Sequence, residues 1–128
     1  MSAGGRCAAR LIAEKDVLAL AIADALYRER PELAAKYGDS GRAKCVQDMR
    51  YNVEHLAPAV ALGDPAMFAG YARWLLSLLT ARGIPAGEIE RSLALTRAEI
   101  GGRFPPDESA AAAPALDAAM AVFGSAAP

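Results

Sequence analysis

Aromatic and imidazole side chains are scarce in this chain of 128 residues. Aromatic residues make up only 6% of it, and His55 is its single histidine. Alanine, by contrast, fills about a quarter of the sequence, and many small residues with few β-branched ones favour helix over sheet. The composition therefore argues against a β-sandwich. Because one imidazole is a thin supply for acid–base chemistry, we also predict no catalytic residues and no enzymatic activity.

An excess of either charge is missing as well. The chain has 14 Lys and Arg residues against 15 Asp and Glu residues, which gives a formal net charge of -1. These charges are dispersed along the sequence without runs of one sign. Such a chain has no broad positive field to attract phosphate backbones or anionic lipids. We therefore expect no nucleic acid and no membrane among its partners.

Cysteines are few and widely spaced. Cys7 and Cys45 are the only two, and they do not form a CxxC pair. This excludes a disulfide-rich scaffold. No second cysteine pair and no further histidine is present to complete a zinc site. We expect two free thiols and no bound metal.

Long apolar runs are lacking too. The most apolar stretch, residues 17–23, is far shorter than the roughly 20 residues needed to cross a bilayer. Charged residues interrupt the N-terminal region at Glu14, Lys15 and Asp16, so no export signal is predicted. We expect a cytoplasmic protein without a membrane span. Because 54% of the residues are apolar, the chain can still bury the core of one domain.

What the sequence does contain is a series of helix signals. The clearest boundary is Gly63-Asp64-Pro65, which combines a helix stop, an N-cap and a first-position proline. Gly38 is a second natural stop, and Gly83 a third. Apolar residues between these signals recur with helical spacing. The pattern predicts helices over residues 7–29 (one helix or two), 31–37, 41–62, 65–82, 84–100 and 114–123, with a frayed C-terminal end.

Three of these helices carry further expectations. Pro58 should kink or loosen the last turn of the helix over residues 41–62, and Gly101-Gly102 should end the helix over residues 84–100. The helix over residues 65–82 contains Trp74, the only tryptophan. We expect it to be the central helix of the core, because it combines this tryptophan with Phe68, Tyr71 and several large aliphatic residues.

The predicted fold class is all-α. About five to seven helices with short loops form either an antiparallel bundle or a globin-like arrangement. Residues 1–103 are predicted to form the helical bundle domain. Residues 104–128 form a Pro/Ala-rich connector and a short C-terminal helix that packs on the bundle or extends from it.

Cys45, Asp48, Asn52 and His55 form the most distinctive polar pattern. At about 100° per residue they fall within about 80° of one another around a helix. A strip of this kind is typical of a ligand pocket, a thiol-based sensor or a metal site. It is more often a solvated flank or an interhelical hydrogen-bond strip, and Cys45 alone fits a small core residue better than a functional thiol.

Aromatic residues of the following helix extend the candidate site. Tyr71 and Trp74, next to Met67 and Phe68, are suited to line a cofactor cavity, and plain core packing explains the same stripe. His55 is the only imidazole available to ligate a haem iron. We take as candidate cofactor-binding residues, with the cofactor unknown, His55, Cys45, Asn52, Tyr71 and Trp74.

Residues 37–85 carry a recognisable series of turns and core positions. They read YGDSGRAKCVQDMRYNVEHLAPAVALGDPAMFAGYARWLLSLLTARGIP. This stretch resembles the all-helical N-terminal domain of bacterial cobalamin-binding sensory proteins, which is similar to the globin-like N-terminal sensor domains of stressosome proteins. The likeness rests on caps, turns and core positions and includes no catalytic motif.

The resemblance implies a non-enzymatic dimeric module that passes a signal to a protein partner. No cobalamin-binding module follows in this sequence, so no cobalamin ligand carries over and a stand-alone input domain is expected. We therefore expect a bacterial regulatory or sensory module that acts through a homodimer or a protein partner. The helices of Trp74 and His55 would enclose a small apolar ligand or a tetrapyrrole. Two alternatives stay open: an accessory subunit of a larger enzyme or assembly, and a haem or other cofactor carrier that uses His55.

Overall fold

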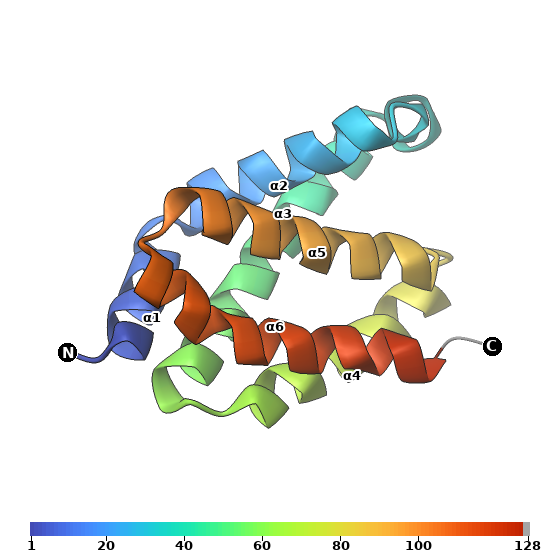
Figure 1. The fold of residues 1–128 in the computed structure, drawn as a ribbon. Helices are drawn as coiled ribbons and strands as arrows, with labels where there is room; N and C mark the ends of the chain where they lie inside the picture. The colour runs from blue at the N-terminus through green and yellow to red at the C-terminus, as the bar shows by residue number, and fades with distance from the viewer. Residues whose placement is uncertain (127–128) are drawn as a thin grey trace.

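The computed structural model describes residues 1–126, and in that range it contains six α-helices and no strand (Figure 1). The predicted all-α helical bundle is confirmed. Residues 127–128, which belong to the predicted frayed end, lie outside the described residues. The helices are α1 (Ala3–Ala13), α2 (Lys15–Glu29), α3 (Glu32–Leu62), α4 (Pro65–Ala81), α5 (Ala86–Arg103) and α6 (Pro106–Ala126).

The turn between α3 and α4 forms as its residues predict. Gly63 has φ 62° and ψ 39°, a left-handed conformation that glycine adopts without steric strain. The Asp64 side chain accepts a hydrogen bond from the backbone N–H of Met67 at 3.3 Å, and Pro65 lies in the first turn of α4. The predicted stop, cap and helix start are all confirmed.

Gly38 divides α3 into two helical segments. Its backbone, with φ 67° and ψ -169°, is not helical, and this conformation is open to glycine because it has no Cβ. The stop predicted at Gly38 is therefore confirmed. The first predicted segment also resolves into two helices, and the break between them falls at Glu14, where φ is -107° and ψ is 13°.

Two glycines that were expected to end α5 do not end it. The helix continues through Gly101 and Gly102 to Arg103. Tertiary packing outweighs the low helix propensity of glycine here, since Ile100 is only 1% exposed. An ion pair one turn apart, from Arg103 Nε to Glu99 Oε2 at 2.9 Å, also supports the last turn.

Two prolines are accommodated inside helices. Pro58 was expected to kink or loosen α3, but Gly38 is the residue with non-helical angles and the helix runs on to Leu62. The Pro58 side chain lies on the exposed side of α3. Pro114 is likewise exposed and lies inside α6 rather than at its start.

The C-terminal helix is longer than predicted. It begins at Pro106 and has 21 residues, and its first turn contains Asp107 and Glu108. Acidic residues are favourable at the positive end of the helix dipole. Small and apolar residues on one side of this helix are buried in the bundle, namely Ala112, Ala115, Leu116, Ala119 and Phe123.

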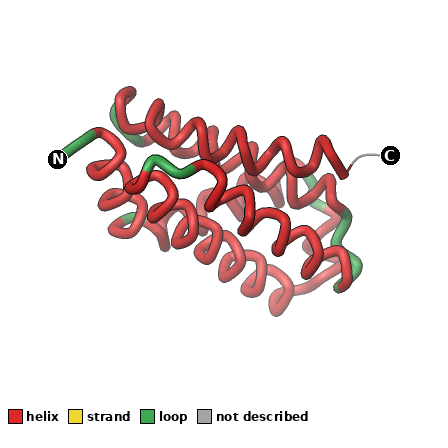
Figure 2. Tube along the Cα trace, turned by 90° about the horizontal axis from the view of Figure 1, so that it is seen from below, coloured by secondary structure: helices red, strands yellow, loops and turns green. Residues whose placement is uncertain are grey.

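Helices α3 and α6 make the widest sets of helix contacts. α3 packs against α1, α2 and α4, whereas α6 packs against α4, α5 and α1, and α2 lies beside α5. The two ends of the described chain lie at opposite ends of the bundle (Figures 1 and 2). Nowhere in residues 1–126 does a helix combine the length and apolar character required for a bilayer span.

Helix α4 contributes Phe68, Leu75 and Leu79 to the core, but Trp74 itself does not lie there. Trp74 is 57% exposed, and Met67 on the same helix is 40% exposed. α4 packs most extensively against α6 and has two apolar sides. The side that contains Ala72 is buried, because a small residue allows a neighbouring helix to approach closely.

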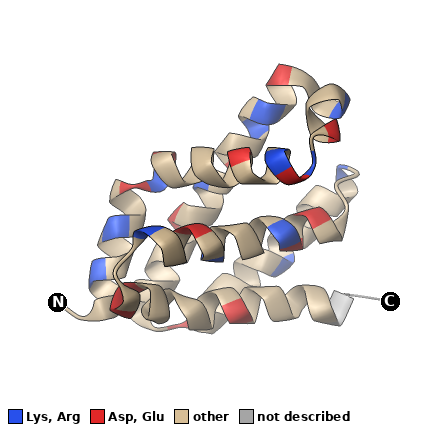
Figure 3. Ribbon diagram, turned by 45° about the horizontal axis from the view of Figure 1, so that its top comes forward, with Lys and Arg blue, Asp and Glu red and all other residues tan. Residues whose placement is uncertain are grey.

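Charged residues of both signs are distributed along the helices (Figure 3). Several of them join helices that are far apart in sequence. Arg10 Nε lies 2.8 Å from Oε1 of the buried Glu108 and so links α1 to α6. Arg91 pairs with Glu29 and links α5 to α2.

Candidate functional site

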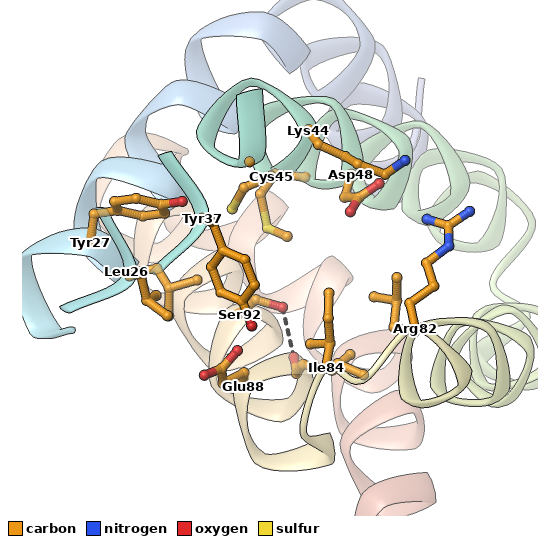
Figure 4. Close-up of a pocket in the computed structure, with 15 residues that line it drawn as sticks. Leu26, Tyr27, Tyr37, Lys44, Cys45, Asp48, Arg82, Ile84, Glu88 and Ser92 are labelled. Atoms are coloured by element: carbon orange, nitrogen blue, oxygen red, sulfur yellow. Dashed lines mark hydrogen bonds between the residues drawn. The ribbon is translucent and has the colours of Figure 1, made fainter. Parts of the chain in front are cut away.

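A cavity of about 260 Å³ lies between α2, α3, the end of α4 and the start of α5, and we call it the α2–α5 pocket (Figure 4). Its apolar wall consists of Leu26, Leu33, Met49, Leu79, Ile84 and Ile89. The rest of the lining comes from Tyr27, Tyr37, Gly41, Lys44, Cys45, Asp48, Arg82, Glu88 and Ser92. Concave sites with apolar walls and a few polar groups are typical of small-molecule binding.

Two glycines shape this pocket. The bend at Gly38 separates Tyr37 from the main part of α3, yet Tyr37 lies close against Gly41. A Cβ at position 41 would come within 2.4 Å of the Tyr37 Cβ. Because Gly41 has no side chain, Tyr37 can pack closely on α3, and its ring forms one side of the pocket (Figure 4).

Two polar groups near Tyr37, the Glu88 carboxylate and the Ser92 hydroxyl, already have partners. The Glu88 carboxylate pairs with Arg30, with 3.2 Å between Nη2 and Oε1, and its side chain is 10% exposed. The Ser92 hydroxyl donates a hydrogen bond to the Ile89 carbonyl at 2.6 Å. These groups are therefore occupied within the protein.

The opposite end of the pocket differs in this respect. Lys44, Asp48 and Arg82 gather there in Figure 4. Among the described residues, none of these three side chains forms a hydrogen bond or a close ion pair. Burial raises the pKa of the Asp48 carboxyl above its ordinary value, and the charges of Lys44 and Arg82 act in the opposite direction. The fold therefore leaves the charged groups at this end of the pocket without close partners.

Cys45 lies in the wall of the pocket and is a free, partly buried thiol. Burial, with a smaller contribution from Asp48, raises its pKa from 9.0 to about 11. The thiol is therefore protonated at neutral pH. Since the thiolate is the reactive form of cysteine, this environment disfavours a thiol-based sensor and favours a packing role for the side chain.

We expect the Cys45 thiol to react with iodoacetamide at pH 8 about 100-fold more slowly than an unperturbed cysteine. The reason is the smaller thiolate fraction that follows from the raised pKa. Peptide mass spectrometry over a time course measures the rate, with the urea-unfolded chain as the control. Equal rates in the folded and unfolded chain would contradict the suppression of the thiolate, and a faster rate in the folded chain would indicate an activated thiol and restore the sensor hypothesis.

Three of the other predicted site residues, His55, Tyr71 and Trp74, lie elsewhere, on a surface shared by α3 and α4. The His55 and Tyr71 rings are stacked with 4.2 Å between their centroids, and the Tyr71 and Trp74 centroids are 5.8 Å apart. At helical spacing, Tyr51 and Leu62 continue the α3 row and Met67 the α4 row. We call this surface the aromatic face, and it consists of Tyr51, His55, Leu62, Met67, Tyr71 and Trp74.

Asn52 lies beneath the aromatic face and is 1% exposed. The Tyr71 hydroxyl donates a hydrogen bond to Asn52 Oδ1 at 2.5 Å, and the Asn52 amide nitrogen lies 4.0 Å from Met49 Sδ. Burial raises the pKa of the Tyr71 phenol, so it stays a donor. This hydrogen bond connects α3 to α4.

His55 does not line the α2–α5 pocket. It is exposed, and its Nδ1 lies 2.8 Å from the Tyr51 carbonyl oxygen. Its ring is covered on one side by Tyr71. Across residues 1–126, no group of three His, Cys, Asp or Glu side chains has a metal-binding arrangement.

Several pocket residues were not recognised from the sequence. Lys44 and Arg82 belong to no motif in the sequence, yet both line the pocket. A second hollow lies between α5 and α6, but the Arg97 side chain on its edge is paired with Asp117. The α2–α5 pocket is thus the cavity whose polar groups are least occupied.

No family model matches the chain, and no curated protein matches it. The class of protein is given by the described residues alone: an all-α bundle that contains the apolar α2–α5 pocket and the exposed aromatic face. The resemblance to the N-terminal domains of cobalamin-binding sensory proteins stays a prediction.

Proposed function

We propose that this chain is a non-enzymatic regulatory module that binds a small, largely apolar molecule in the α2–α5 pocket. The observation that carries the proposal is the pocket itself, with its apolar wall and its unpaired polar end. Its volume of about 260 Å³ exceeds the roughly 150 Å³ of a cavity that binds benzene. It is below the usual range for drug-sized ligands. This favours a small ligand over a tetrapyrrole.

The module is proposed to act as a homodimer through the aromatic face. Trp74 is 57% exposed, Leu62 69% and Tyr51 42%, and contiguous exposed apolar surface is typical of interaction sites. Two parallel rows of similar side chains suit a two-fold contact in which each copy presents the same patch. A formal net charge of -1 adds little repulsion between copies.

Helix α3 would connect the two sites. Cys45 and Met49 line the pocket, whereas Tyr51 and His55 belong to the aromatic face. The Asn52–Tyr71 hydrogen bond then transmits a shift of α3 to α4. A ligand that binds one packing of α3 more tightly would change the population of dimer-competent molecules.

Thermal unfolding with 3-phenylpropanol as a neutral probe tests the pocket. We expect the probe to raise Tm of the natural chain, because it binds the folded state alone. The variant Cys45→Phe should fill the pocket and abolish the increase. Ala43→Phe is the matched control, since Ala43 is exposed on α3 and lies outside the lining. An unchanged Tm in the natural chain, or an equal rise in Cys45→Phe, would contradict the proposal.

A further inference from the structure

The charges at the open end of the α2–α5 pocket indicate which kind of ligand it takes. Lys44 projects from α3, and Arg82 follows the last turn of α4. Figure 4 shows both side chains at the same end of the cavity, with Asp48 beside Lys44. Two cationic groups and one carboxylate therefore share this end.

These two cations differ from most others in the chain. Eight arginines pair with a carboxylate within the fold, namely Arg6, Arg10, Arg30, Arg42, Arg50, Arg91, Arg97 and Arg103. Within residues 1–126, neither Lys44 nor Arg82 has such a partner at close range. A cation that the fold leaves unpaired beside an apolar cavity is available to an anionic ligand.

The remaining charges do not cancel this positive end. Glu88 is held by Arg30, away from Lys44 and Arg82 in Figure 4. Asp48 offsets one of the two cations, so one positive charge is left over. A ligand with a single negative charge would restore neutrality, whereas an ammonium ligand would leave two excess positive charges on the pocket.

The apolar wall determines the chemical character of the part of the ligand outside the charged head group. Leu33, Met49 and Ile89 line the cavity away from the charged end. Burial of an apolar body against them contributes free energy in proportion to its area. A volume of about 260 Å³ restricts that body to one ring or a short chain.

We propose that the α2–α5 pocket binds a small amphipathic monocarboxylate, with its carboxylate against Lys44 and Arg82 and its apolar body against Leu33, Met49 and Ile89. This inference rests on the proposed ligand-binding function and specifies its ligand class. Guanidinium and ammonium groups both form charge-assisted hydrogen bonds with carboxylates. The free acid has the same apolar body but lacks the charge, so the anion is the bound form.

Three probes with one apolar body test the head group: 3-phenylpropionate, 3-phenylpropanol and 3-phenylpropylamine. Titration calorimetry on the full chain should give about tenfold tighter binding for the carboxylate than for the alcohol, and weaker binding for the amine. Higher salt should reduce the advantage of the carboxylate, because the charged groups are near solvent.

Variants then assign the head group to its residues. In the double variant Lys44→Gln/Arg82→Gln, the dissociation constant of the carboxylate should differ from that of the alcohol by less than about threefold. The dissociation constant of the alcohol should be unchanged. Arg73→Gln, an exposed arginine of the same helix as Arg82, is the control and should keep the full preference. Unchanged alcohol binding also shows that the double variant is folded.

The outcomes separate this inference from the proposed function. If the alcohol binds and the carboxylate has no advantage, the ligand class is wrong and the pocket remains. If the amine binds most tightly, Asp48 is the head-group partner and the inference is overturned. Failure of all three probes contradicts the proposed function together with the ligand class.

Discussion

Replacing Trp74 with glutamate is expected to weaken self-association of the chain at least about 30-fold, the effect of losing a hot-spot residue worth roughly 2 kcal/mol. Trp74 is 57% exposed in the single chain and lies beside Tyr71, whose ring stacks on His55. An exposed tryptophan on an apolar face is the kind of residue that dominates interface energetics. Sedimentation velocity over a concentration series measures the dissociation constant.

A matched control is available on another exposed apolar surface. Val17 on α2 is 52% exposed, so Val17→Glu introduces the same charge at a similar exposure. The Val17→Glu chain should associate like the natural chain. If Val17→Glu dissociates and Trp74→Glu does not, the dimer uses α2, and the aromatic face is not the interface. A natural chain that is monomeric at every concentration would contradict dimerisation altogether.

The helix boundaries that could be predicted are those decided by neighbouring residues. Gly38, Gly63 and Gly83 all have positive φ, and each was expected to stop a helix. Asp64 and Pro65 act on backbone groups within one turn. Such local chemistry is readable from the sequence, because it does not depend on what the helix packs against.

The boundaries that were missed depend on tertiary contacts. Gly101 and Gly102 lower helix propensity, yet burial of Ile100 keeps α5 helical past them. Pro114 is a helix starter by local rules, but packing of Ala112 and Ala115 extends α6 in front of it. These contacts involve residues that are distant in the sequence. A single sequence therefore cannot show whether local helix propensity or tertiary packing decides the boundary.

The predicted site residues fall into two separate places in the structure for a related reason. Cys45 and His55 share a side of α3 by angle, but ten residues of helix separate them by about 15 Å along the axis. Cys45 therefore lies in the pocket while His55 lies on the aromatic face. Helical spacing predicted which side of α3 the two residues share, but it did not show that their positions along the helix axis would place them in different sites. Which apolar side of α4 becomes buried was likewise undetermined, since both sides carry large residues.

Removing the Tyr71 hydroxyl is expected to lower the free energy of unfolding by about 1–3 kcal/mol, the cost of a buried polar group without a partner. In Tyr71→Phe, Asn52 Oδ1 loses its 2.5 Å hydrogen bond while Asn52 remains 1% exposed. Burial raises the pKa of the Tyr71 phenol, so the natural chain keeps this donor at neutral and mildly alkaline pH. Urea unfolding at neutral pH measures the difference.

The double variant Tyr71→Phe/Asn52→Leu distinguishes the hydrogen bond from simple packing. Asn52→Leu removes the buried acceptor, so adding Tyr71→Phe to it should cost much less than Tyr71→Phe costs alone. Equal costs in the two backgrounds would mean that the hydroxyl contributes through packing. Comparison of the natural chain with Tyr71→Phe also tests whether this hydrogen bond couples the pocket to the dimer. If the bond transmits movement of α3 to α4, Tyr71→Phe should reduce the effect of 3-phenylpropanol on the dimer dissociation constant. The pocket, which contains neither residue, should still bind the probe.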